Sequence, residues 1–162
     1  MTLVTKNQPK PCFRVVIGIF CNGGNIMGFV YTELTLKNSR DVINAIDGDI
    51  KESEVRQKTL KALVDTGHFS LIINEELRRE LGLEIRGKKD VILADNTREI
   101  CFITEAVEIH WKDRDAALSV LVVPDSPNVR MGTFILGYMD LVIDPVRQEV
   151  IGAHGDEWII YI

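Results

Sequence analysis

The chain has 162 residues, the usual size of one domain, and its net charge of −5 argues against a general nucleic-acid binder, because neutralising phosphates requires a basic face. Hydrophobic residues make up 46% of the chain, so it can build a core. Its 19 Ile and 16 Val residues favour β-sheet.

Residues 1–26 differ from the rest of the chain because they contain no Asp or Glu. Two interpretations stay open. The first is a translated leader, since Gly23-Gly24 shortly before Met27 is compatible with a purine-rich ribosome-binding sequence. The second is a genuine extra β-strand over residues 13–20. The domain is expected over residues 27–162.

Next in order, residues 28–36 partly alternate between apolar and polar, which predicts a half-buried strand. Residues 37–58 are polar and charged and are expected to form a surface loop or hairpin excursion. Residues 59–64 predict a strand that becomes fully apolar before Asp65, and residues 69–73 form another apolar run.

A single short helix is predicted after this run. Asn74 is a suitable N-cap, Glu75 and Glu76 suit the positive N-terminal end, and Gly82 fits the position after the last turn. The remaining segments predict strands separated by turns, which favours an all-β sandwich or barrel. These segments are residues 91–94, 98–111, 116–123, 134–143, 149–151 and 158–162.

The three cysteines, Cys12, Cys21 and Cys101, show no CxxC spacing, so neither a zinc site nor a disulfide framework is expected. No apolar run approaches the ~20 residues that span a bilayer. The apolar run over residues 15–20 is also short for a signal peptide. A cytoplasmic protein with reduced thiols and no membrane partner is therefore expected.

The sharpest chemical feature is Asp65-Thr66-Gly67 directly after an apolar strand. Such a strand fixes the backbone and delivers the carboxylate at its end, and Gly67 permits a tight turn. Two facing carboxylates that share one proton can act as base and acid on one water. The chain has only one Asp-Thr-Gly, so a second carboxylate would have to come from another subunit. As a bare tripeptide the motif also fits an ordinary turn.

The context of the motif resembles the retropepsin-like aspartic proteases, particularly small bacterial members. The resemblance covers residues 59–152 and rests on four segments in order. They are Leu63-Val64-Asp65-Thr66-Gly67, the apolar run and helix that end in Leu81-Gly82-Leu83, Leu93-Ala94-Asp95-Asn96, and Leu141-Val142-Ile143-Asp144-Pro145.

The resemblance implies a closed β-barrel with one short helix that is active as a homodimer. Asp65 would be the catalytic acid and base, paired with Asp65 of the second chain, and Thr66 would brace the two loops. The flap over an extended peptide substrate would be Leu93, Ala94, Asp95, Asn96, Thr97 and Arg98. No metal or cofactor would be needed.

The family also has an apolar-apolar-Gly segment beneath the catalytic loop. Gly132 fits this segment by spacing and Gly137 by composition, and Gly132 is preferred, with Arg130 as a departure from the pattern.

The larger departure is His68, because the family prefers a small residue after Asp-Thr-Gly. A positive imidazole there would favour the ionised carboxylate and could crowd the water, or the ring could turn outward.

Three functional hypotheses follow. The first is an aspartic endopeptidase. The second is an inactive, protease-like dimer that binds peptides, and the third is an unrelated β protein in which Asp-Thr-Gly is only a turn. Elsewhere, His110 and His154 are expected on the surface or satisfied by hydrogen bonds. Asp144-Pro145 is expected to end a strand, and Cys101 to lie in the core.

Overall fold

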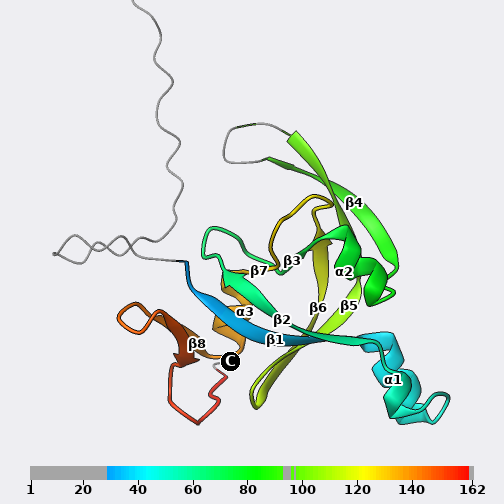
Figure 1. The fold of residues 1–162 in the computed structure, drawn as a ribbon, viewed down its shortest axis with the longest axis horizontal. Coiled ribbons are helices and arrows are strands. Elements are labelled where there is room, and N and C mark those ends of the chain that lie inside the picture. Colours follow the sequence, from blue (N-terminus) through cyan, green and yellow to red (C-terminus); the bar gives the residue numbers. More distant parts are fainter. Residues whose placement is uncertain (1–28, 93–95, 97, 161–162) are drawn as a thin grey trace, which may run out of the picture.

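A computed structural model describes residues 29–92, 96 and 98–160 (Figure 1). The interpretations of residues 1–26 concern residues outside this range. The strands are β1 (Tyr31–Asn38), β2 (Gln57–Val64), β3 (Ile72–Ile73), β4 (Ile85–Ile92), β5 (Arg98–Trp111), β6 (Arg114–Val122), β7 (Arg130–Met131), β8 (Leu141–Asp144) and β9 (Glu149–Gly152). The helices are α1 (Ser39–Asp47), the 3₁₀ turn η1 (Glu52–Glu54), α2 (Glu75–Glu80) and α3 (Thr133–Tyr138).

Seven strands form one sheet in the order β1-β2-β7-β3-β6-β5-β4, and β8 pairs with β9 in a separate hairpin. The long strand β5 also pairs with β1, so the pairings run from β1 through β2, β7, β3, β6 and β5 back to β1. The expected mostly β architecture is confirmed. Strands β4 and β5 are antiparallel neighbours, and Ile92 pairs with Arg98.

The core draws on nearly all of the strands. Apolar side chains of every strand from β1 to β9 except β4 enter it, together with side chains of α2 and α3. The alternation of β5 is typical of a strand with one face in a core: Val107, Ile109 and Trp111 are buried at every second position. Cys101, on the same strand, is 1% exposed, which confirms the prediction that it is a core residue.

The expectation of a surface loop over residues 37–58 is wrong, because this segment contains α1 and η1. Asn38 caps α1 by accepting hydrogen bonds from the backbone N–H groups of Arg40 and Asp41, and Gly48 ends the helix with a φ of 84°. These cap signals are present in the sequence. They do not accompany a buried apolar stripe, since Asp41 is the buried residue of α1.

The strand predicted over residues 134–143 is also wrong in its first half. Residues 133–138 form α3, and the strand begins only at Leu141. The run Phe134-Ile135-Leu136 has no polar position, so its periodicity does not distinguish a buried strand from a buried helix. The protein therefore has three α-helices in its described part, where one was expected. Trp158–Ile160, expected to begin a strand, lies outside any strand.

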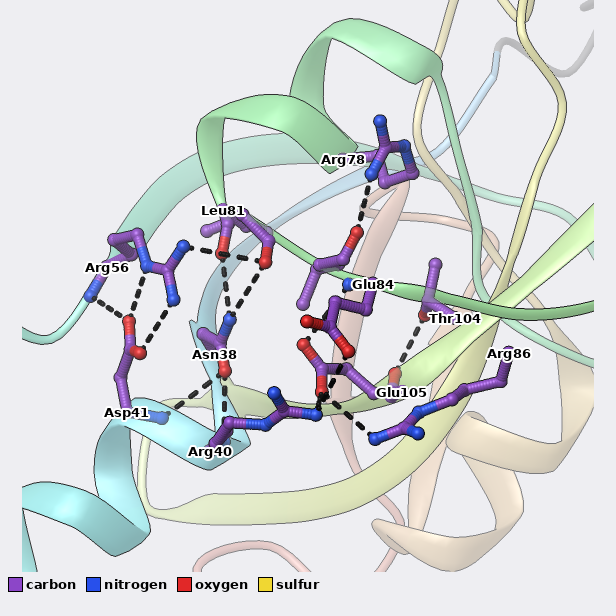
Figure 2. A network of polar contacts seen from close by, with 12 residues as sticks. Asn38, Arg40, Asp41, Arg56, Arg78, Leu81, Glu84, Arg86, Thr104 and Glu105 are labelled. Carbon is purple, nitrogen blue, oxygen red and sulfur yellow. Dashed lines mark hydrogen bonds and ion pairs between the residues drawn. The ribbon is translucent and has the colours of Figure 1, made fainter.

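A network of polar contacts attaches α1 to the rest of the fold (Figure 2). The Asn38 side chain, fully buried, donates to the carbonyl of Leu81 at 3.0 Å. Arg56, directly before β2, donates to both carboxylate oxygens of Asp41 at 2.6 and 2.7 Å. Arg40 forms ion pairs with Glu84 and Glu105, which lie on the β4–β5 side. The helix is therefore held in a defined orientation.

Among the described residues, no helix has both the length and the apolar character needed to cross a membrane.

Candidate active site

The end of β2 is fixed by a parallel pairing with β7. Leu63 pairs with Arg130, and Val64 pairs with Met131. The backbone N–H of Asp65 then donates to the carbonyl of Met131 at 2.9 Å, so the pairing continues one residue beyond the strand. Because Met131 is fully buried, Asp65 is delivered from a backbone that packing holds in place.

A compact turn follows this strand end. The backbone N–H of Gly67 donates to Asp65 Oδ1 at 3.0 Å, and that of His68 donates to the Asp65 carbonyl at 3.2 Å. The Asp65 side chain is 23% exposed, so the carboxylate is partly desolvated but accessible. Within the described residues, the Thr66 side chain has no hydrogen-bond partner.

Gly132 lies against the loop that carries Asp65. A Cβ at this position would stand 2.5 Å from the carbonyl carbon of Phe69 and 2.5 Å from the carbonyl oxygen of Ser70. The first turn of α3 continues the contact, since Thr133 N–H donates to the His68 carbonyl at 2.8 Å and Phe134 N–H donates to the Phe69 carbonyl at 3.0 Å. Gly137 makes no comparable contact.

Two basic side chains face the Asp65 carboxylate. His68 Nδ1 lies 2.8 Å from Asp65 Oδ2, and Arg130 Nη1 lies 3.8 Å from the same oxygen. Neither contact has the geometry of a hydrogen bond, and His68 Nδ1 and Arg130 Nε are buried without hydrogen-bond partners. The His68 ring therefore turns toward the carboxylate, not away from it. From the sequence, Arg130 was noted only as a departure from the family pattern. Its proximity to Asp65 could not be predicted, because it depends on the pairing of β2 with β7.

The predicted flap lies at the tip between β4 and β5. Leu93, Ala94, Asp95 and Thr97 are outside the described residues, so their predicted role stays a prediction. Asn96 has a φ of 64°, in the left-handed region that Asn tolerates better than most residues.

Other titratable residues singled out from the sequence have local partners. His154 Nδ1 lies 2.9 Å from an Asp140 oxygen, and this contact holds the pKa of Asp140 below its usual value. His110 Nε2 lies 3.1 Å from Glu108. Burial raises the pKa of the Cys101 thiol, which opposes a role as a nucleophile. In the described residues, no group of three His, Cys, Asp or Glu side chains could hold a metal ion.

Asp144 ends β8 in a turn, as expected. Its Oδ1 accepts hydrogen bonds from the backbone N–H groups of Val146 and Arg147 at 2.8 and 3.0 Å. These bonds, chiefly the one from Arg147, lower the pKa of the Asp144 carboxyl.

An exposed aromatic row beside the Asp65 loop was not foreseen from the sequence. Phe69 is 70% exposed and lies 5.2 Å from Phe134 between ring centroids, and Tyr138 follows at 6.0 Å from Phe134. Phe134 and Tyr138 are themselves 39% and 42% exposed. The row combines a residue that follows Asp65-Thr66-Gly67 with two from α3. The close approach of Gly132 and the hydrogen bonds from Thr133 and Phe134 bring these segments together.

No protein-family model and no curated protein matches the chain. Among solved structures, it is similar to the retroviral protease-like domain of Ddi1 from Leishmania major, with a TM-score of 0.46 and 16% identity over 72% of this chain and 81% of that chain. It is also similar to a retropepsin-like aspartic protease from Rickettsia conorii, with a TM-score of 0.38 and 16% identity over 72% of this chain and 88% of that chain. Both are retropepsin-like domains, the group that the motifs around Asp65 resemble.

Proposed function

We propose that the protein is an aspartic endopeptidase whose active site is shared by two copies of the chain in a closed-barrel homodimer. The observation that carries the proposal is the Asp65-Thr66-Gly67 turn. Its carboxylate is partly exposed, while its backbone is fixed by β7 and by the close approach of Gly132. A strand-end turn that served only to reverse the chain would not require both supports.

In this mechanism, a water molecule lies between the two Asp65 carboxylates, which together hold one proton. One carboxylate removes a proton from the water as its oxygen bonds to the peptide carbonyl carbon, and the other protonates the carbonyl oxygen. The C–N bond of the resulting diol then breaks as the leaving nitrogen takes up a proton from one carboxyl and the other carboxylate removes a hydroxyl proton, which leaves a carboxylic acid, an amine and a dyad that again holds one proton. The substrate would bind as an added β-strand beneath residues 93–97.

A second copy is required because one carboxylate cannot divide the two proton transfers. The aromatic row of Phe69, Phe134 and Tyr138 supports a subunit contact near the site, since it exposes apolar surface beside the Asp65 loop. Thr66 makes no side-chain hydrogen bond within the described residues, and we expect it to donate across that contact.

The proposal is tested with a peptide library incubated with the protein from acidic to neutral pH, with and without pepstatin. We expect pepstatin-sensitive cleavage that falls at least about 10³-fold in Asp65→Asn. The matched control is Asp144→Asn, which changes another strand-end aspartate and should stay within about twofold of wild type. A folded dimer without cleavage at any pH would remove the enzyme assignment.

The positions of His68 and Arg130 beside Asp65 bear on the second hypothesis, an inactive dimer that binds peptides. Two basic side chains lie within 4 Å of the Asp65 carboxylate, in the space beside the proposed dyad. If the wild-type protein binds peptides without cleaving them and His68→Ala cleaves, the imidazole is the cause and the natural protein is a binding module. If wild type cleaves, the hypothesis is wrong.

A further inference from the structure

The exposure pattern of α1 is the reverse of that of an ordinary surface helix. The residue buried against the fold is the acid Asp41, whereas Ile43 is 56% exposed and Ile46 is 78% exposed. Ile43 and Ile46 stand three residues apart and therefore share one face of the helix. A helix that packs for stability alone places such side chains inward.

Ile46 lines a hollow between α1, η1 and the near ends of β1 and β2, and Ile43 lies one turn earlier on α1. The hollow has a volume of about 340 Å³, and its apolar lining comes from Val42, Ala45, Ile46 and Val55. This volume lies at the lower end of the range of ligand pockets, which suits one or two side chains of a peptide better than a large cofactor.

Hydrogen bonds hold α1, which forms one side of the hollow, in a fixed position. Asn38 caps α1 and donates to the carbonyl of Leu81. Arg56, directly before β2, donates to both oxygens of the Asp41 carboxylate (Figure 2). A surface that is ordered before binding loses little conformational entropy when a partner arrives.

The stretch from the end of α1 through η1, part of which lines the hollow, is acidic. Asp47, Asp49, Glu52 and Glu54 are all exposed, and none has an ion pair within the described residues. Glu52 lines the hollow together with Lys37, and Lys51 lies in the same acidic stretch, so the four acids and two lysines together carry a net charge of −2. Arg40 and Arg56 are already paired with acids of the fold.

We propose that the α1 surface, defined as Val42, Ile43, Ile46 and Val55 with the acidic rim of Asp47, Asp49, Glu52 and Glu54, binds a basic, apolar segment of a partner protein. Apolar side chains of the segment enter the hollow, and its Lys or Arg residues face the rim. The surface lies at the opposite end of β2 from Asp65, about 25 Å along the strand (Figure 1). It therefore goes beyond the proposed peptidase function and does not depend on it.

The test measures binding of a fluorescent, 14-residue amphipathic Lys/Leu peptide to the full chain carrying Asp65→Asn, which prevents cleavage. We expect saturable binding in the range of about 1–100 μM that weakens with salt. Ile43→Ser with Ile46→Ser should weaken it at least about tenfold, as should Asp47→Asn with Asp49→Asn and Glu52→Gln. Val146→Ser, which changes an 86% exposed apolar residue elsewhere, is the matched control and should leave binding unchanged.

Four results would overturn the proposal. The first is no saturable binding up to about 1 mM. The second is equal binding by the Ile43→Ser/Ile46→Ser variant, which would indicate attraction of charge alone. The third is self-association that this variant abolishes, which would make a second copy the occupant. The fourth is a gain in peptide affinity on removing residues 1–26, which would make that basic segment the occupant. Circular dichroism confirms that each variant is folded.

Discussion

An aspartate lies beside each end of β2, Asp41 of α1 next to its start and Asp65 directly after its end, and the two carboxylates have opposite surroundings. At its start, Asp41 is 6% exposed and accepts three hydrogen bonds from Arg56, one of them from the backbone. At its end, Asp65 accepts one backbone hydrogen bond and lies near His68 and Arg130 without hydrogen bonds to either. The hydrogen bond from the Arg56 side chain is the main reason that the pKa of Asp41 is lowered.

The difference in hydrogen bonding distinguishes a carboxylate with a structural role, Asp41, from one whose oxygens stay accessible, Asp65. Asp41 has satisfied acceptors and little access to solvent, so its charge serves to hold α1. Asp65 keeps acceptor capacity free at an accessible edge, while its backbone is fixed by β7. A fold can position a carboxylate without neutralising it by fixing the backbone of the residue and leaving the carboxylate oxygens free.

The largest stability effect is expected on the Asp65 side, from Gly132→Ala. The new Cβ would meet the backbone of Phe69 and Ser70, which cannot move aside as a flexible side chain can, so we expect a loss of about 3 kcal/mol or more. The measurement is the free energy of unfolding in urea. Gly137→Ala is the control within the same helix, and it should be neutral or stabilise by up to about 1 kcal/mol. Equal losses in both variants would show that Gly132 does not support the loop.

Removing the charge of Asp41 or of Asp65 should have different effects on the free energy of unfolding. Asp41→Asn leaves the Arg56 guanidinium without its charged partner beside a buried position, and we expect a loss of about 2 kcal/mol. Asp65→Asn keeps an oxygen for the Gly67 N–H and should change stability by less than about 0.5 kcal/mol. Thermal and urea unfolding of both variants measure this contrast. A loss at Asp65 equal to that at Asp41 would mean that both are structural acids.

A smaller effect is expected at Glu75, whose pKa is lowered from 4.5 to about 2, chiefly by the hydrogen bond from Arg78 and also by Arg79. A lowered carboxyl pKa contributes stability that is present above pH 4.5 and is lost as the pH falls toward 2. Because the pair is partly exposed, we expect Glu75→Gln to cost only about 1 kcal/mol at pH 7, with no difference remaining near pH 2. A difference that stays constant over this range would exclude the linkage.

The features that follow from local pattern were predictable from the sequence. The Asn74 cap and the acidic first turn indicated α2, and the alternation over residues 98–111 indicated β5 with its bounds. Features that depend on segments distant in the chain were not. The run Phe134-Ile135-Leu136 is helical because α3 begins where Gly132 meets the Asp65 loop, and α1 is held by Asp41 and Asn38 in place of apolar packing.

The residues of the candidate site likewise fall into those that the sequence predicted and those that it did not. Asp65, Thr66 and Gly67 were identified by their place after an apolar strand, and spacing favoured Gly132 over Gly137 for the segment beneath the loop. The contact of Arg130 with Asp65 and the aromatic row beginning at Phe69 were not identified, because each joins two segments that only the tertiary fold brings together.

The central claim, one active site built from two copies of Asp65, is tested most directly by mixing wild-type protein with Asp65→Asn at constant total concentration after subunit exchange. If both carboxylates are required, only the wild-type homodimer is active. An equal mixture should then keep about a quarter of the wild-type rate of peptide cleavage. If each chain works alone, the mixture should keep about one half of that rate, and this result would contradict the account.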